Sequence, residues 1–223
     1  MKIALIGYGK MGHAIEALAA ERGHEVTVKI DKDDPWPAEM DADVAIEFTM
    51  PATAVGNMLR CLETGVPVVC GTTGWYAEYE KVVSECRHRK GRLFTATNFS
   101  IGMNIMFALN ARLAEMMRGR DDYKVSISET HHIHKLDAPS GTAITLQEQI
   151  VESGKRKAES VPIASFREGE VPGTHTVVYD SEIDTITLTH EAHSRKGLAL
   201  GALLAAEFLA KAAPGVYTMK DIL

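Results

Sequence analysis

The residues best suited to chemistry lie in one stretch, 131–143, which reads HHIHKLDAPSGTA. Three histidines and a lysine come directly ahead of a Pro-Ser-Gly-Thr turn: His131, His132, His134 and Lys135. Histidine titrates near neutral pH and is the usual general acid of enzymes. The turn opens a predicted helix over 141–153, whose amides and dipole favour an anion beside its first residues: Ser140, Gly141 and Thr142. We therefore expect a carboxylate at the helix start, while His132 and Lys135 bind or protonate a second anionic centre.

Two other interpretations of this stretch compete with anion binding. Close histidines can bind zinc, but the only acids nearby are Glu129 and Asp137, and the adjacent lysine would repel a dication. We therefore predict no metal site. The second alternative is a solvated polar loop, since a single histidine of this kind would carry little information.

The segment GYGKMG near the N-terminus predicts a dinucleotide site. Gly7, Gly9 and Gly12 form a GxGxxG pattern directly after an apolar run and at the start of a predicted helix. In that context the glycines permit a tight turn and a close approach to a pyrophosphate at the helix N-terminus. The residues between them, Tyr8, Lys10 and Met11, belong to the same expected site.

Asp31 bears on the choice of cofactor. It lies nineteen residues beyond Gly12, at the end of the second predicted strand, where an acid would hydrogen-bond the adenosine ribose. An acid there disfavours a 2′-phosphate, whereas the neighbouring Lys29 and Lys32 could bind one. The sequence thus predicts NADH and leaves NADPH open.

The first hundred residues alternate short apolar runs with helical segments. Strands are expected at 2–6, 25–31, 43–48, 66–70 and 92–96, with helices between them. This alternation predicts an α/β fold, a Rossmann-like doubly wound parallel sheet with helices on both faces. Ligands of such a sheet lie at the carboxyl ends of its strands. Two further segments fall there: Gly71, Thr72 and Thr73, and Ala96, Thr97, Asn98 and Phe99.

After Asn98 the pattern changes. A helix over 102–119 carries four apolar residues at helical spacing, Met106, Leu109, Leu113 and Met116, which we interpret as core packing rather than a cofactor site. The remaining elements are a strand at 122–129, the helix 141–153, strands at 161–167, 174–180 and 184–191, and an apolar helix at 197–213. In the last strand Ile186, Leu188 and His190 alternate with threonines, which is typical of a sheet with one covered face.

Composition restricts the function classes. The 223 residues carry a formal net charge of −6, so a dense cationic face for nucleic acid or an anionic membrane is not expected. No segment approaches the roughly 20 apolar residues of a membrane span, and the first residues do not form a signal peptide. The cysteines, Cys61, Cys70 and Cys86, are odd in number and lack a CxxC pair. They fit a reducing compartment, and we expect a cytoplasmic protein.

The stretch 129–143, ETHHIHKLDAPSGTA, resembles the signature E-x-H-H-x-x-K-x-D-A-P-S-G-T-A of the 4-hydroxy-tetrahydrodipicolinate reductase (dihydrodipicolinate reductase) family of lysine and diaminopimelate biosynthesis. Other segments resemble family segments in the same order along the chain: EFTMP (47–51), CGTTGW (70–75), ATNFSIGMN (96–104), HEAHSRKGLALGA (190–202) and VYTMKDIL (216–223).

This resemblance implies a reductase that transfers a hydride from NADH or NADPH to a small dianionic ring dicarboxylate, converting 4-hydroxy-tetrahydrodipicolinate to tetrahydrodipicolinate. It also implies a dinucleotide-binding domain at 1–100, completed by 196–223. A central α+β domain with a mixed open sheet, 101–195, would bind substrate and form a homotetramer. A hinge between the two domains would bring hydride donor and acceptor together.

The resemblance also implies roles for single residues. His131 would be the catalytic proton donor/acceptor and Lys135 the proton donor. The substrate carboxylates would be bound by His132, Gly141 and Thr142, with Ser140 beside them. The cofactor would be lined by Gly7, Tyr8, Gly9, Lys10, Met11, Gly12, Asp31, Lys32, Phe48, Gly71, Thr72, Thr73, Ala96, Thr97, Asn98 and Phe99.

Some features depart from the family pattern. Many relatives carry a GxxGxMG loop instead of GxGxxG, and the stretches 32–41 and 161–180 are short here, which bears on cofactor preference and assembly.

The nearest alternative function is that of a two-domain dehydrogenase of an amino or keto acid, which would share the first hundred residues but not HHxxKxDAPSGTA. A nucleotide-sensing regulator is the other, but it would need a basic DNA-binding module that no segment supplies. The late pair Arg195 and Lys196 is too short for one, although Arg195 could face the ligands.

Overall fold

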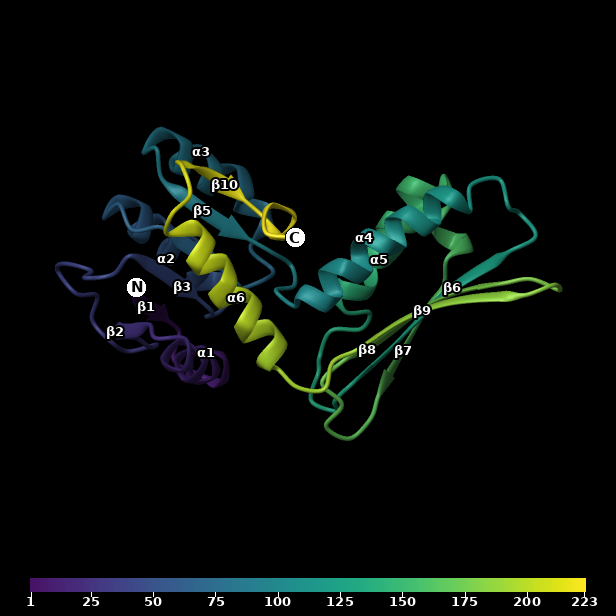
Figure 1. The fold of residues 1–223 in the computed structure, drawn as a ribbon, viewed down its shortest axis with the longest axis horizontal. Coiled ribbons are helices and arrows are strands. Elements are labelled where there is room, and N and C mark those ends of the chain that lie inside the picture. The colour runs from purple at the N-terminus through teal and green to yellow at the C-terminus, as the bar shows by residue number, and fades with distance from the viewer. The chain divides into compact units, whose positions relative to one another are not determined.

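A computed structural model describes all 223 residues, whose contacts divide the chain into two compact units (Figure 1). The first unit contains Met1–Ile101 and Lys196–Leu223. The second contains Gly102–Arg195. The first has a sheet with two buried apolar clusters and the second has a sheet with one, so each can position a separate set of side chains.

The first unit is built on a six-stranded sheet in the order β10-β5-β4-β3-β1-β2, with every neighbouring pair parallel. Its strands are β1 (Lys2–Ile6), β2 (Glu25–Ile30), β3 (Val44–Glu47), β4 (Val68–Cys70), β5 (Arg92–Thr95) and β10 (Gly215–Tyr217). The five strands predicted before Asn98 are all present. The sequence did not predict β10, because it has only three residues, starting at the glycine of the Pro214-Gly215 pair, which are too few to show a period of two.

Helices cover both faces of this sheet. They are α1 (Lys10–Glu21), α2 (Pro51–Glu63), α3 (Tyr79–His88) and α6 (Lys196–Leu209), and 3₁₀ turns lie at Tyr76–Glu78 and Met219–Asp221. Buried residues of α2 and α3 share one apolar cluster, and those of α1 and α6 share the other. The last helix ends at Leu209, earlier than the predicted 213, because the chain must turn there to form β10. The doubly wound α/β fold is confirmed.

The second unit has a mixed four-stranded sheet in the order β7-β6-β8-β9. Its strands are β6 (Lys124–His131), β7 (Ile163–Arg167), β8 (Thr174–Asp180) and β9 (Thr185–Glu191). β6 pairs parallel with β7, and the other pairs are antiparallel. Two helices, α4 (Ile101–Met116) and α5 (Gly141–Gly154), share a buried cluster with the inward-facing residues of the sheet, and a 3₁₀ turn lies at Ala158–Ser160. The expected mixed open sheet is confirmed.

Three details of the second unit correct the sequence interpretation. The stripe predicted on α4 is half right: Met106 is buried and Leu113 packs against the core cluster, whereas Leu109 and Met116 are 54% and 64% exposed. The buried face of the helix carries Met103, Met106, Phe107, Asn110 and Ala114. In β9, Ile186 remains 36% exposed, so its face is only partly covered. Strand β6 extends to residue 131, which puts His131 in the sheet and not in the following loop. No helix is long and apolar enough to cross a membrane.

Candidate active site

The turn between β1 and α1 is shaped by its glycines. Gly7 has φ +92°, and a Cβ there would lie 1.9 Å from the backbone oxygen of Phe48. A Cβ at Gly12 would lie 2.6 Å from the oxygen of Gly7. At Gly9, the N-cap of α1, a Cβ would meet nothing within 4 Å. Two glycines are therefore required by packing, whereas the third leaves the helix N-terminus open to a phosphate group.

A cavity of about 390 Å³ lies at this turn. It is lined by residues that follow three different strands: Gly9, Lys10, Met11, Phe48, Thr49, Pro51, Gly71, Thr72 and Thr73. A Cβ at Gly71 would lie 2.1 Å from the Phe48 ring, so the absence of a side chain lets the ring lie against the backbone. The structure thus brings three separately predicted cofactor segments together, and adds Thr49 and Pro51, which sequence reasoning missed.

Glu47 is a third residue that sequence reasoning missed. This carboxylate at the end of β3 is fully buried and accepts hydrogen bonds from Thr49 Oγ1, from Asn57 Nδ2 at 3.3 Å and from Cys70 Sγ at 3.2 Å. The amide of Thr49 donates in turn to Thr72 Oγ1 at 2.7 Å. Glu47 therefore ties together the loops after β3 and β4. Its signal was an acid in an otherwise apolar strand.

Asp31 and Lys32 are both exposed just beyond β2, and the amide of Gly7 donates to Ile30 O at 2.7 Å, which keeps the end of β2 beside the glycine turn. The ammonium of Lys29 is engaged elsewhere. It lies 2.6 Å from Glu16 Oε1 and donates to the Tyr8 hydroxyl at 3.1 Å. Of the two lysines suggested for a 2′-phosphate, only Lys32 lacks such an anchor among these contacts.

The segment after β5 divides into exposed and buried parts. Thr97 is exposed, Ala96 and Asn98 are partly buried, and Phe99 is buried. The Phe99 ring lies 6.0 Å from the Phe48 ring, and a Cβ at Gly201 of α6 would lie 1.7 Å from Phe99 O. Phe99 thus packs behind Phe48 and helps to fix its ring.

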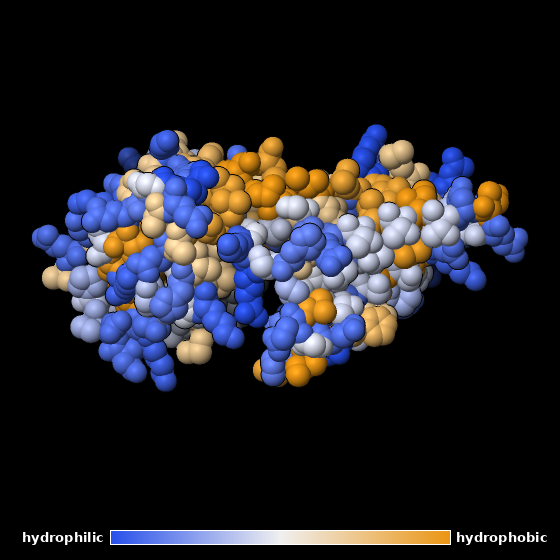
Figure 2. Space-filling model, turned by 60° about the horizontal axis from the view of Figure 1, so that its bottom comes forward, coloured by the Kyte–Doolittle hydropathy of each residue, from blue (hydrophilic) through white to orange (hydrophobic).

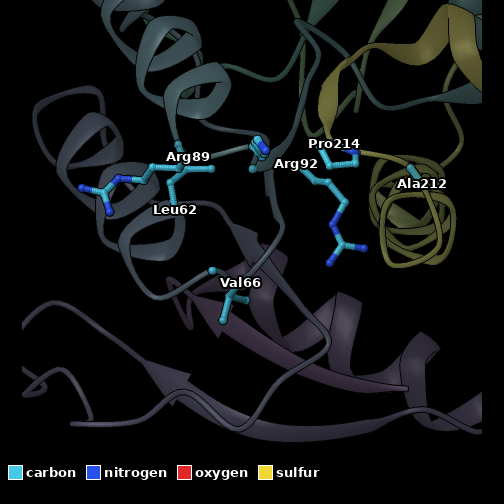
Figure 3. Close-up of a pocket in the computed structure, with 9 residues that line it drawn as sticks. Leu62, Val66, Arg89, Arg92, Ala212 and Pro214 are labelled. Carbon is cyan, nitrogen blue, oxygen red and sulfur yellow. The ribbon is translucent and has the colours of Figure 1, made fainter.

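A second cavity, of about 330 Å³, opens at the amino end of β5 (Figure 3). Two arginines line it, and Figure 3 shows their side chains pointing apart. Arg92 donates to Ala210 O at 2.8 Å, beyond the end of α6, and Arg89 pairs with Glu85 of its own helix. Because these cations serve helix ends, and because ligands of parallel sheets lie at the opposite edge, we do not assign the cofactor here.

In the second unit the ionisable residues gather at one end of the inner sheet face. Glu129 of β6 is paired with His175 of β8, which is paired with His190 of β9. His131 lies two residues after Glu129, on the same face, and is paired with Arg167 of β7. Non-local strand pairing therefore assembles a cluster that the sequence shows only as scattered residues.

Glu129 is at the centre of this cluster. Its Oε1 accepts from the Ser140 amide at 2.9 Å and from Ser165 Oγ at 2.8 Å, and lies 3.8 Å from the Arg167 guanidinium. Its Oε2 lies 3.4 Å from His131 Nδ1 and 3.6 Å from His175 Nε2. Burial alone would raise the pKa of Glu129, but the serine hydrogen bonds and the nearby His131 outweigh it and lower that pKa. The carboxylate is thus ionised at neutral pH.

The two histidines beside Glu129 are held neutral by burial. His131 is 7% exposed, and burial lowers its pKa; Glu129 raises the pKa, while Lys135 and Arg167 lower it further. His175 is 4% exposed, and burial lowers its pKa to about 4. Their rings meet edge to face, with centroids 5.0 Å apart.

The loop after β6 carries the predicted lysine. Lys135 Nζ lies 2.8 Å from Asp137 Oδ1. The guanidinium of Arg167 donates to the backbone oxygens of Lys135, at 3.2 Å, and of Asp137. Arg167 therefore clamps the loop that presents the lysine, and sequence reasoning had missed it.

The other two loop histidines take different positions. His132 Nε2 lies 3.3 Å from the Arg195 guanidinium, so that the cation suggested from the sequence lies beside it. His134 is exposed and pairs with Glu170 at 3.3 Å. The three histidines of the sequence stretch therefore face different partners.

Helix α5 begins beside the buried cluster. Ser140 is its N-cap and is buried; its Oγ accepts from the Ala143 amide at 3.2 Å and lies 3.3 Å from His175 Nε2. Gly141 is exposed and Thr142 partly buried. The helix N-terminus thus presents Gly141 and Thr142 to an anion, while Ser140 orients the helix start.

A different histidine set from the one considered in the sequence has metal-like spacing. One ligand atom each from Glu129, His131 and His175 lie within 4.8 Å of one another. However, Arg167 lies 3.8 Å from the same carboxylate, and the charge of Lys135 acts on His131. These two cations oppose a bound dication, and hydrogen-bonded proton chemistry accounts better for the cluster.

Comparisons with known proteins agree along the whole chain. Residues 1–99 match the family model "Dihydrodipicolinate reductase, N-terminus", and residues 102–223 match "Dihydrodipicolinate reductase, C-terminus". A 4-hydroxy-tetrahydrodipicolinate reductase of Christiangramia forsetii is 46% identical over 100% of this chain and 98% of its own length. One of Methanopyrus kandleri is 38% identical over 82% of this chain and 72% of its own.

A solved structure has the same fold. The dipicolinate-bound dihydrodipicolinate reductase of Paenisporosarcina sp. TG-14 aligns with a TM-score of 0.81 at 23% identity, and the alignment covers 100% of this chain and 99% of that one. At that identity the likeness shows the fold alone. The two family models and the relative of 46% identity decide the family. The chain belongs to the dihydrodipicolinate reductase family.

Proposed function

We propose that this protein is a 4-hydroxy-tetrahydrodipicolinate reductase that acts in lysine and diaminopimelate biosynthesis. The observation that carries the proposal is the cluster at the end of β6, where two candidate proton donors, His131 and Lys135, lie next to a helix N-terminus suited to a carboxylate. Relatives with this name, and the dipicolinate bound to the similar structure, support a ring dicarboxylate as substrate.

Family and fold imply a nicotinamide cofactor, and the residues of the first unit fit one. The turn requires Gly7 and Gly12 for packing and leaves Gly9 open at the start of α1. When bound, the cofactor supplies the hydride that reduces the ring. We propose that the residues predicted from the sequence line it: the glycine turn 7–12, Asp31, Lys32, Phe48, Gly71–Thr73 and Ala96–Phe99.

NADH is the proposed preferred cofactor, with weaker use of NADPH. An exposed carboxylate at Asp31 suits the free ribose hydroxyls and repels a 2′-phosphate. Lys29, which could have offset that repulsion, is paired with Glu16 and Tyr8. Lys32 remains as the cation for the phosphate.

In the second unit the chain's own residues handle protons and charge. Gly141 and Thr142 hold one substrate carboxylate at the start of α5, and His132 binds the other. When the hydroxylated ring has lost water and taken up the hydride, negative charge lies on a neighbouring ring carbon, and an acid in the same loop must deliver a proton there. His131 and Lys135 are the two candidates, and the cationic loop lowers the energy of the developing charge.

The direct test is oxidation of NADH, and then of NADPH, with substrate generated in place from pyruvate and aspartate semialdehyde by a coupled synthase. We expect absorbance to fall only when the synthase and both of its substrates are present. Binding of dipicolinate to the protein by calorimetry provides a check that does not depend on turnover. Dinucleotide binding without turnover of either cofactor would contradict the proposal.

We propose that Gly102–Arg195 is the substrate-binding and tetramerisation domain, and that the rest of the chain is the dinucleotide-binding domain. The sheet face opposite the cluster carries short hydroxyl side chains, such as Ser126, Thr176 and Thr187, together with the 55% exposed Phe166. A face of this kind can pair with copies of itself in a homotetramer. Sedimentation equilibrium of the full chain tests it, and a monomer would contradict it.

We further propose a cytoplasmic location. All three cysteines are free and buried, which suits a reducing compartment. Cell fractionation with an antibody against the full chain tests this placement.

A further inference from the structure

We infer that Glu129 is the positioning residue of the proton-transfer site: its carboxylate fixes the tautomer and orientation of His131 and, through separate contacts, the loop that carries Lys135. This inference rests on the proposed reductase function for its consequence in catalysis. The geometry on which it depends is independent of that function.

The first step is the division of labour between the two carboxylate oxygens. Oε1 takes the hydrogen bonds from the Ser140 amide and Ser165 Oγ. Oε2 accepts no hydrogen bond in the structure, although it is buried, and its nearest polar neighbours are His131 Nδ1 at 3.4 Å and His175 Nε2 at 3.6 Å. A buried anionic oxygen with no other donor strongly favours N–H groups at these two positions.

The second step concerns the tautomer of His131. Its Nδ1 is also buried without a hydrogen bond, and it faces an ionised carboxylate. The proton of the neutral ring therefore belongs on Nδ1, which leaves Nε2 as the nitrogen that gains and gives a proton. A Cβ at Gly173 would lie 3.1 Å from Nε2, so the glycine at this position keeps that nitrogen uncrowded.

The third step is the charge balance around His131. Glu129 and Asp137 favour its protonated form, whereas Lys135 and Arg167 oppose it, and the burial of the ring opposes it further. On β8, His175 stays neutral and adds no charge, and the next strand brings only His190, whose pKa burial also lowers. Among these groups Glu129 has the largest effect in favour of an imidazolium. Without Glu129, the pKa of His131 would lie lower still, and the ring would take up the proton it must donate less readily.

The fourth step is the loop. Arg167 lies between Glu129 and the loop: its guanidinium is 3.8 Å from Oε1 and donates to the backbone oxygens of Lys135 and Asp137. The Ser140 amide, at the far end of the same loop, donates to Oε1 directly. One carboxylate thus holds the proton donors and the helix start in a fixed relation.

The test combines histidine side-chain nitrogen NMR of the full chain with steady-state kinetics across pH. In the native protein we expect the His131 ring as the Nδ1–H tautomer. In Glu129→Gln we expect the His131 pKa to fall by about one pH unit, since a charge at this distance has that size of effect. We expect kcat to fall by about 10- to 100-fold, the usual cost of losing a partner that orients a functional histidine, with little change in KM.

Two control variants separate positioning from packing. Ser165→Ala removes a donor to Oε1 but leaves Oε2 facing His131, so the His131 titration should stay in place. Glu148→Gln makes the same chemical change at an exposed site on α5 and should alter neither readout. If Glu129→Gln does not fold, two other measurements test the inference. They are the His131 tautomer in the native protein and the His131 titration in Glu129→Asp, whose shorter side chain keeps the negative charge but places it farther from the ring.

An Nε2–H tautomer in the native protein, or an unchanged His131 titration in Glu129→Gln, overturns the inference. Failure of the proposed function looks different: the native protein would not oxidise NADH or NADPH, while the nitrogen shifts would still report on Glu129.

Discussion

The proposed cofactor end of the first unit and the histidine end of the second both lie where strands finish, yet they are shaped by different means. At the first, Gly7, Gly12 and Gly71 lie where a Cβ would be within 2.6 Å of a neighbouring atom. At the second, Glu129, His131 and His175 are charged or titratable groups removed from water. Backbone shape controls the first end and buried charge the second.

The distribution of polar groups reinforces this contrast. On the face that Figure 2 shows, blue, hydrophilic side chains alternate with orange, hydrophobic patches. Both buried histidines belong to the second unit, while the first buries only Glu47 among its ionisable acids. Substitutions at the first end should therefore act through cofactor binding and backbone strain, and substitutions at the second through proton transfer and pH.

The largest expected effect breaks the second end alone. Lys135→Ala and His131→Ala each remove a candidate proton donor, and general acid catalysis commonly contributes about 10² to 10⁴ in rate. We expect kcat to fall by about 10²- to 10⁴-fold in at least the variant that lacks the residue protonating the ring. The affinity for NADH, measured by fluorescence titration, should stay within about twofold of the native value. Lys157→Ala, which removes an exposed lysine elsewhere in the same unit, is the matched control. Equal loss of NADH binding would contradict the separation of the two ends.

A second prediction concerns acid. The folded pKa of His175 is about 4, below the unfolded value of about 6.5, so between these pH values the unfolded chain binds the extra proton. Stability is therefore full above pH 6.5 and falls as the pH drops toward 4, by about 3 kcal/mol from this residue. The lowered pKa values of His131 and His190 act in the same direction.

Hydrogen exchange at pH 7 and pH 5 can locate that loss. We expect β6 and β8 to lose protection before β1 and β3, because the first unit buries no histidine. His175→Gln should flatten the dependence on pH even if it lowers stability at neutral pH. Uniform loss of protection across both units would show that the acid sensitivity does not arise from this cluster.

The first end should respond to backbone changes instead. In Gly7→Ala the new methyl would lie 1.9 Å from Phe48 O at φ +92°, and a non-glycine residue held in such a conformation costs on the order of 1–3 kcal/mol. Gly9→Ala meets nothing within 4 Å, so it should leave the melting temperature unchanged but weaken NADH binding by filling the phosphate approach. Thermal melts and NADH titrations of the pair separate these effects. A Gly9→Ala protein that binds NADH normally would argue against a pyrophosphate at this turn.

Local sequence patterns predicted one end better than the other. The glycine turn and the strands before Asn98 follow from short-range spacing, and the structure gathers the loops after β1, β3 and β4 around one cavity. The pairing of Glu129 with His175 joins residues on separate strands, so no local sequence pattern could predict it. The same limit explains why the end of β6 was placed two residues early and why Arg167 was missed. The two wrongly placed residues of the α4 stripe, Leu109 and Met116, had another cause: apolar residues occur on more than one side of that helix, so spacing alone did not identify the buried face.

The smallest expected effect concerns exposed charges at the first end, which should influence the choice between NADH and NADPH. Asp31→Asn removes the carboxylate that repels a 2′-phosphate, and we expect the ratio of kcat/KM for NADPH over NADH to rise by about tenfold, the equivalent of 1.4 kcal/mol. Glu16→Gln tests whether the pairing of Lys29 matters, because it releases an ammonium now held at 2.6 Å. If the released lysine reaches the phosphate, that ratio rises as well, and Lys32→Ala lowers it.

These surface charges also predict a dependence on salt that the buried cluster should not share. Exposed charges are screened at high ionic strength, whereas groups buried as deeply as Glu129 are screened much less. Raising the salt concentration should therefore reduce the difference between Asp31→Asn and the native protein and leave the pH profile set by His131 in place. If the ratio of kcat/KM for NADPH over NADH did not change with salt concentration, the shape of the cavity at Phe48 and Gly71, rather than the charge at Asp31, would select the nucleotide.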